Sequence, residues 1–368
     1  MFERRLYFHI DWALLAAVLL IVAIGLAMIY STTYVTVGGV SRAGPQVKTQ
    51  VYALVLGLMA LAICMMVDYR MLAEHSLLLY FGLLGLLIYV LVKGSTQFGA
   101  QRWISLGAFN LQPSEFARIV LSLILAMYFG ENRRGARNTG DLLVGGIFVA
   151  VPLLLIAKQP DLGTAATLVP VFLGVAYLAG LRMRLLGAIA LIAVLVAPVA
   201  WQFALKDYQK SRLQTFIDPQ QDPRGAGYQT IQARITVGSG GLTGKGFMEG
   251  TQGQYKFLPV AHNDFIFSVL AEEQGFLGVL VVLGLYLFVV LRSLEAARLA
   301  KDRLGVYLVG GIIAGFTFQV VYNVAMSVGL APVKGITLPL MSYGGSSLIA
   351  TLAAFGLILN VRMRQFTN

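Results

Sequence analysis

The chain has 368 residues, of which 58% are hydrophobic and 12% are charged, and its formal net charge is +11. A water-soluble domain carries about 25% charged residues, so this composition excludes a soluble globule and indicates a membrane protein. The basic residues are dispersed and many flank apolar segments, which favours the membrane surface over nucleic acid as their partner. The single cysteine, Cys64, excludes an intramolecular disulfide and a thiolate metal site.

Ten apolar segments are candidates to cross a bilayer, which takes roughly 20 residues each. They lie near 12–30, 51–68, 76–93, 115–130, 142–157, 164–181, 184–204, 265–292, 304–330 and 336–361. The link between the fifth and sixth contains Pro160 and Gly163, which predicts a tight turn or a re-entrant bend. We therefore expect an all-α integral membrane protein with about ten transmembrane helices, forming a single polytopic membrane domain over residues 1–368.

Basic residues in short loops predict the orientation. With both termini inside, fourteen Lys or Arg residues fall in inner segments and seven in outer ones. Both termini are therefore predicted to be cytoplasmic. The long loop 205–263, between the seventh and eighth helices, and the polar segment 94–114 then face outward. The long loop is functional or disordered by its length, and its aromatic residues predict short helices on the outer surface.

Ionisable groups at membrane depth are costly and are candidates for function. On the outer side they are Arg102, Glu115, Arg118, Asp161, Lys245, Asp264, Glu272 and Glu273. Asp264 precedes an apolar run, so it is either a helix cap, which contributes about 1 kcal/mol, or a general base. Glu272 and Glu273 lie roughly 12–13 Å further along a continuous helix, unless Gly275 and Gly278 bend it. The alternative to a functional role for Glu272 and Glu273 is a structural one, in ion pairing or helix capping.

Two further patterns concern phosphate. Glu115 and Arg118, three residues apart, either pair with each other or face a cavity with the arginine ready for phosphate. The glycine-rich segment 238–246 lacks the Walker pattern, because Gly246 rather than Ser or Thr follows Lys245. A flexible glycine turn that presents Lys245 to a phosphate is left open.

Several motifs are absent from the sequence. It contains no H-E-x-x-H, C-x-x-C or D-x-D, which leaves a zinc protease and a soluble nucleotide-sugar transferase unsupported. The three histidines, at 9, 75 and 262, are too scattered for a metal cage. A divalent cation, magnesium or manganese, held jointly by carboxylates and a substrate pyrophosphate is left open.

The most specific pattern is the run NVAMSVGLAPVKGITLPLMSYGGSS at 323–347. With 99–107, 112–116, 159–165, 238–247 and 259–278, it resembles the SEDS family (shape, elongation, division and sporulation) along the whole chain. The first helix and the short N-terminal tail are most similar to the RodA branch. Two positions depart from the family pattern: Arg118 stands where many relatives have lysine, and Lys334 stands where the signature is usually uncharged.

The resemblance implies a peptidoglycan glycosyltransferase of the bacterial cytoplasmic (inner) membrane, polymerising lipid II on the extracytoplasmic face for cell elongation and rod shape. It implies a class B penicillin-binding protein as partner, with elongation-complex proteins as further candidates. It also implies that Asp264 is the essential residue. The candidates to stabilise the leaving pyrophosphate are Arg102, Arg118, Arg212 and Lys245, while Glu115 and Asp161 would orient those cations or bind a metal.

The chemistry follows from the substrate. An α-linked undecaprenyl pyrophosphate and a β-1,4 product bond require one inverting displacement, with Asp264 taking the proton of the acceptor 4-hydroxyl. The alternative function is a lipid II flippase or transporter, but no convincing internal repeat is visible and the charges gather on one side. A non-catalytic scaffold would leave the outer acidic and basic cluster unexplained.

Overall fold

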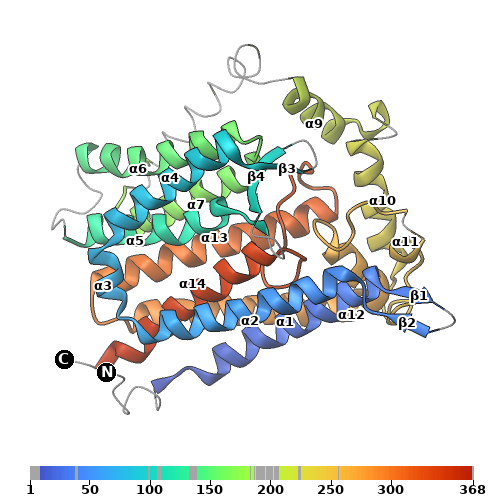
Figure 1. Ribbon diagram of the computed structural model, residues 1–368, viewed down its shortest axis with the longest axis horizontal. Helices are drawn as coiled ribbons and strands as arrows, with labels where there is room; N and C mark the ends of the chain where they lie inside the picture. Colours follow the sequence, from blue (N-terminus) through green and yellow to red (C-terminus); the bar gives the residue numbers. More distant parts are fainter. Residues whose placement is uncertain are drawn as a thin grey trace.

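The computed structural model describes residues 9–37, 40–97, 100–105, 110–131, 139–182, 184, 185, 187, 195, 202, 207–222, 225–255 and 257–366. Most of these residues form helices that run side by side along the long axis (Figure 1). Within these ranges eight helices are long and apolar enough to cross a membrane. They are α1 (Trp12–Thr33), α2 (Pro45–Met66), α4 (Ser76–Lys93), η2 with α5 (Pro113–Phe116, Ala117–Glu131), α6 (Thr139–Lys158), α12 (Ile266–Arg298), α13 (Arg303–Ser327) and α14 (Gly345–Met363).

The remaining elements are shorter. Helix α7 (Leu162–Leu178) is apolar but has only 17 residues. The other helices are α3 (Tyr69–Glu74), α9 (Asp207–Ile217), η4 (Pro219–Gln221), α10 (Ala226–Ser239), α11 (Thr251–Gln254) and η5 (Arg364–Phe366). Strands β1 (Val35–Val37) and β2 (Val40–Arg42) form an antiparallel hairpin, and β3 (Ser95–Gln97), β4 (Ala100–Ser105) and β5 (Asn110–Leu111) form an antiparallel sheet.

The all-α membrane architecture is confirmed, with small strands added in the polar connections. Short helices occur in the segment 205–263, as expected. The predicted seventh span, 184–204, lies almost entirely outside the described residues. The predicted last span, 336–361, is wrong at its start, since α14 begins only at Gly345. Before it, residues 328–344 form a loop in which Gly329 and Gly335 have φ of +76° and +69°, which a helix does not allow.

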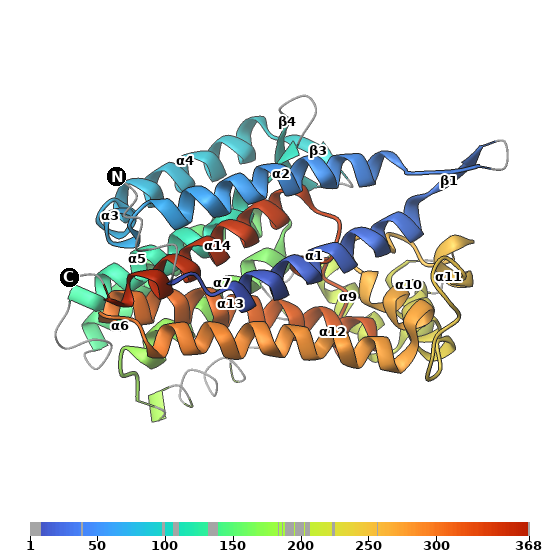
Figure 2. The ribbon, with the colours of Figure 1, turned by 90° about the horizontal axis from the view of Figure 1, so that it is seen from below.

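The two ends of the bundle differ. Helix α1 begins and α14 ends at one end, which also carries α3; we call this the terminal end (Figure 2). The β1–β2 hairpin and helices α10 and α11 lie at the opposite end, which we call the loop end. That both termini are cytoplasmic stays a prediction.

Helix α14 forms the centre of the bundle. In its apolar window 89% of the residues are buried, against 28% for α4, whose outward face is apolar. Small residues allow close approach to α2: a Cβ on Gly356 would stand 2.6 Å from the Leu61 carbonyl oxygen. Close backbone approach through small residues is the usual basis of helix association in lipid, where apolar burial alone gives little driving force.

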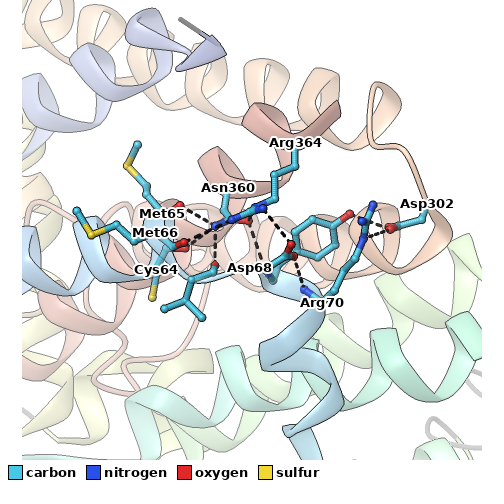
Figure 3. Close-up of polar contacts among 10 residues, drawn as sticks. Cys64, Met65, Met66, Asp68, Arg70, Asp302, Asn360 and Arg364 are labelled. Atoms are coloured by element: carbon cyan, nitrogen blue, oxygen red, sulfur yellow. Dashed lines mark hydrogen bonds and ion pairs between the residues drawn. The ribbon is translucent and has the colours of Figure 1, made fainter. Parts of the chain in front are cut away.

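A polar cluster at the terminal end ties α14 to α2 (Figure 3). The Asn360 side-chain amide donates to the carbonyls of Cys64, Met65 and Val67 at 2.7–2.9 Å. The carbonyls of the last helical turn have no partner within the helix, so Asn360 satisfies groups that α2 leaves open. Arg364 of η5 also pairs with Asp68, at 2.9 Å.

Replacing Asn360 by alanine is expected to destabilise the protein by about 2–3 kcal/mol, because three buried or partly buried carbonyls lose their shared donor. The thermal midpoint in detergent should fall by roughly 3–6 °C. Differential scanning fluorimetry of the purified protein measures this change. The control is Gln220→Ala, which removes an amide from an exposed side chain; equal midpoints for the two variants would contradict the role given to Asn360.

Helix α12 is bent rather than continuous. Gly275 has φ +65° and ψ −169°, and residues 240–246, which we call the clip loop, pair with the backbone groups that this bend exposes. The amides of Lys245 and Gly246 donate to the carbonyls of Glu272 and Glu273 at 2.9 and 3.0 Å. In return the amides of residues 276 and 277 donate to residues 241 and 242 at 2.9 and 3.1 Å. The bend and the clip loop therefore form one unit.

Glu272 and Glu273 stabilise this unit through their side chains. Glu272 is fully buried and forms an ion pair with Lys245 at 2.6 Å. The Glu273 carboxylate accepts a hydrogen bond from Ser31 of α1. Of the alternatives that the sequence left open, bending at Gly275 is confirmed, and ion pairing is confirmed for Glu272 but not for Glu273. Neither carboxylate lines the cavity described below.

Candidate active site

Asp264 lies two residues before α12, which begins at Ile266 with Phe265 at its N-cap position. No side chain caps this helix end, so the helix-cap interpretation of Asp264 is wrong. The residue is fixed through its backbone, since Asn323 of α13 donates to the Asp264 carbonyl at 2.9 Å and to the Ile336 carbonyl at 2.7 Å. Among the described residues the Asp264 carboxylate has no hydrogen-bond or ion-pair partner.

The Asp264 carboxylate lines a cavity of about 580 Å³. This volume is within the range of ligand-binding sites. The lining comes from parts of the chain far apart in sequence: Thr49, Arg102, Trp103, Asn110, Gln112, Glu115, Asp161, Thr164, Arg212, Gln229, Val260, Asn263, Asp264, Phe265, Val333, Lys334, Gly335, Thr337 and 343–347. Five of the residues predicted from sequence thus meet here: Asp264, Arg102, Glu115, Asp161 and Arg212.

Arg102 and Asp161 form one side of the cavity. Arg102 Nη1 stands 3.6 Å from Asp161 Oδ1, and its Nη2 donates to the Pro160 carbonyl at 3.0 Å. Asp161 caps α7 by accepting from the Thr164 amide at 3.1 Å, and Gln112 Nε2 donates to its other oxygen at 3.0 Å. Both charges are therefore already partnered within the protein.

Glu115 and Arg118 form an ion pair of 2.6 Å, and both are buried. The pairing predicted from their spacing is confirmed. Glu115 lines the main cavity, whereas Arg118 lies behind it and borders a second, much smaller cavity with Gln319 and Thr351. Arg118 is thus separated from the main cavity by its own partner.

Lys245 is not part of this cavity. Its Nζ contacts Glu272 at 2.6 Å and Thr251 Oγ1 at 2.8 Å in the clip loop unit. Arg212, which α9 supplies from the segment 205–263, does line the cavity and donates to the Val333 carbonyl at 3.4 Å. Of the four cations suggested by sequence, Arg102 and Arg212 therefore reach the cavity.

Sequence reasoning missed several lining residues. Lys334 lines the cavity, although it was noticed only as a charged residue in the 323–347 signature. Asn263 has a buried Oδ1 without a partner in the described part of the chain. Tyr343, whose amide donates to the His262 carbonyl at 2.9 Å, belongs to the same signature. Membership of the signature was the one signal that could have identified Lys334 and Tyr343.

The environment of Asp264 suits a base. Burial raises the pKa of Asp264 to about 6, while Arg212 and Arg102 act to lower it and Asp161 raises it. Burial disfavours the charged carboxylate, and the two arginines favour it. A base whose pKa lies close to neutral pH is ionised under ordinary conditions and still accepts a proton effectively.

The sequence is similar to a known protein family along nearly its whole length. The family model for FtsW, RodA and SpoVE, described as "Cell cycle protein", matches residues 11–366. The chain is 37% identical to the peptidoglycan glycosyltransferase MrdB of Escherichia coli (strain K12), covering 97% of this chain and 94% of MrdB. It is 32% identical to the peptidoglycan glycosyltransferase RodA of Treponema pallidum (strain Nichols), covering 96% and 98% of the two chains.

The fold is also similar to solved structures of related proteins. The crystal structure of the Thermus thermophilus rod shape determining protein RodA superposes with a TM-score of 0.72 at 31% identity, covering 98% of each chain. A chain from a study of "structural coordination of polymerization and crosslinking by a peptidoglycan synthase complex" superposes with a TM-score of 0.83 at 34% identity, covering 98% of this chain and 99% of that one.

Proposed function

Because the chain belongs to the FtsW/RodA/SpoVE family, in its RodA branch, we propose that it is a peptidoglycan glycosyltransferase that polymerises lipid II, with Asp264 as its base. The assignment of Asp264 as the base rests on one observation. Asp264 lines a cavity of about 580 Å³, and its carboxylate has no hydrogen-bond or ion-pair partner among the described residues. Carboxylates held for structure alone, such as Glu272, are paired.

The proposed reaction is one inverting displacement. The Asp264 carboxylate accepts the proton of the acceptor 4-hydroxyl as that oxygen bonds to the donor's anomeric carbon. On the opposite face of the sugar, the bond from the anomeric carbon to the phosphate oxygen breaks, and the pyrophosphate leaves with the electron pair. Asp264 then returns its proton to water.

We propose that the loop end faces outward from the bacterial inner membrane and that both termini are cytoplasmic. Basic residues in α3, the last turns of α12 and α14, and η5 support this orientation: Arg70, Arg292, Arg298, Arg362 and Arg364. The cavity would then open on the extracytoplasmic face. The similarity to a chain of a peptidoglycan synthase complex supports a class B penicillin-binding protein as partner, and elongation-complex proteins remain further candidates.

We also propose that a divalent cation, magnesium or manganese, can take part in binding the substrate. No group of three or more His, Cys, Asp or Glu side chains within the described ranges is placed to hold a metal. In the cavity Asp161 and Glu115 are paired with arginines, which leaves Asp264 as the protein ligand. Such a cation would therefore be held mainly by pyrophosphate oxygens, and it would supply stabilisation of the leaving group.

Polymerisation of labelled lipid II by the purified protein tests this function, with and without the partner and magnesium. Glycan strands that depend on the protein and on Asp264 are the expected product. Transfer of lipid II across vesicle bilayers without polymer growth would instead support the flippase alternative.

The rate of polymerisation is expected to rise with pH and to reach half of its maximum near pH 6. The carboxylate is the active form of Asp264, and burial raises its pKa to about 6. Since Arg212 acts to lower that pKa, Arg212→Gln should move the acidic limb to higher pH. Initial rates between pH 5 and pH 8 check both statements, and an acidic limb centred below about pH 5, near the usual carboxylate pKa, would contradict them.

A further inference from the structure

Lys334 lies in the 328–344 loop, where the backbone at and beside it contacts Arg212, the first turn of α7 and Asp264. Arg212 of α9 donates to the carbonyl of Val333, immediately before it. The Lys334 carbonyl packs on the first turn of α7, where a Cβ on Gly163 would stand 2.7 Å from it. Immediately after it, a Cβ on Gly335 would stand 3.5 Å from Asp264 Oδ2. The backbone therefore fixes Lys334 between the base and Arg212.

Among the described residues, the charged side chains that line the cavity do not all pair with one another. Arg102 is paired with Asp161, and Glu115 with Arg118. Two cations and one carboxylate remain, namely Arg212, Lys334 and Asp264. In the described part of the chain Lys334 makes no hydrogen bond or ion pair, and the one hydrogen bond of the Arg212 side chain goes to the Val333 carbonyl.

These two cations are close enough to repel each other. Burial lowers the pKa of Lys334, and the neighbouring Arg212 lowers it further. Two cations held side by side repel each other, and an anion that contacts both relieves this repulsion. The arrangement is therefore preorganised for a ligand that carries adjacent negative charges.

We propose that Lys334 and Arg212 form the pyrophosphate subsite of the cavity, which holds the leaving group of a polyprenyl pyrophosphate-linked sugar beside Asp264. This rests on the proposed function. A guanidinium supplies a planar fork of donors and an ammonium supplies a compact charge, and both suit phosphate oxygens. The same subsite would bind the polyprenyl pyrophosphate product.

The subsite also connects binding with base strength. A bound pyrophosphate places negative charge near Asp264 and pairs with Arg212, one of the two arginines that lower the pKa of Asp264. Both effects make the carboxylate a stronger base when the leaving group is in position. Departure of the pyrophosphate would reverse them.

Binding measurements test the subsite without requiring turnover. The probes are undecaprenyl pyrophosphate, inorganic pyrophosphate and undecaprenol, each titrated into the full-length protein in detergent and followed by calorimetry. Lys334→Gln is expected to weaken undecaprenyl pyrophosphate about tenfold, and Lys334→Arg to stay within about threefold of the unmodified protein. The control Lys93→Gln removes an exposed lysine of α4 that does not line the cavity and should change nothing.

The results of these titrations distinguish failure of the proposed pyrophosphate subsite from failure of the proposed glycosyltransferase function. Inorganic pyrophosphate should show the same dependence on Lys334 with lower affinity, and undecaprenol should show none. Unchanged binding of both pyrophosphates by Lys334→Gln and Arg212→Gln overturns the subsite, even if the protein polymerises lipid II. Lysine-dependent binding by a protein that forms no glycan would instead overturn the proposed function and leave the subsite standing.

Discussion

Replacing Asp264 by asparagine is expected to lower the rate of glycan polymerisation by roughly 10²–10⁴-fold, the usual contribution of a general base. The amide keeps the size of the side chain but cannot accept the proton of the sugar hydroxyl. The carboxylate has no hydrogen-bond or ion-pair partner among the described residues, so its replacement should leave the thermal midpoint within about 1 °C. A large loss of rate without loss of stability distinguishes a base from a structural carboxylate.

Two further variants serve as controls for the polymerisation rate of Asp264→Asn. Asp264→Glu retains a base at a displaced position and should recover part of the rate. Asp218→Asn changes an exposed aspartate in the segment between α9 and α10 and should polymerise at the normal rate. A folded Asp264→Asn protein that works within about threefold of the unmodified one would transfer the role of base to another group.

Replacing Gly275 by valine is expected to cause the largest loss of stability, about 3–5 kcal/mol. Its φ of +65° is unfavourable for any β-branched residue, at a cost of about 1–3 kcal/mol. A side chain there would also overlap the Gly244 backbone nitrogen. The clip loop would have to withdraw, with loss of backbone hydrogen bonds worth about 1 kcal/mol each.

Thermal unfolding in detergent measures this effect, and the midpoint should fall by roughly 5–10 °C. The matched control is Gly284→Val on the same helix, where an added Cβ meets no atom within 4 Å. If both variants lowered the midpoint equally, the bend at Gly275 would be incidental rather than required by the clip loop.

Local signals predicted the parts of the site that depend on local geometry. The spacing of Glu115 and Arg118 predicted their ion pair, because side chains three residues apart on a helical turn are neighbours. The position of Asp264 before an apolar run placed it at the start of a membrane helix. That pattern could not separate a helix-capping carboxylate from one that lines a cavity, because the difference is a two-residue shift of the helix start.

The features that sequence missed depend on long-range packing. Residues 336–341 are mostly apolar, which predicts a membrane helix, but they are buried inside the protein as an irregular loop. Hydropathy does not distinguish burial in protein from burial in lipid. The same loop carries Lys334 into the cavity, and the conformation that places it there is set by contacts with Arg212, α7 and Asn323.

The pairing of the clip loop with α12 also dictates an order of events during synthesis. Residues 240–246 leave the ribosome before Gly275, so those of their backbone groups that pair with α12 have no such partner until α12 has been translated and inserted. Unpaired backbone groups are excluded from the hydrocarbon core, so the newly made loop must wait in water beside the membrane. The segment around Asp264 is fixed between α12 and α13 only afterwards, so a partly translated chain holds no assembled cavity with which to act on lipid.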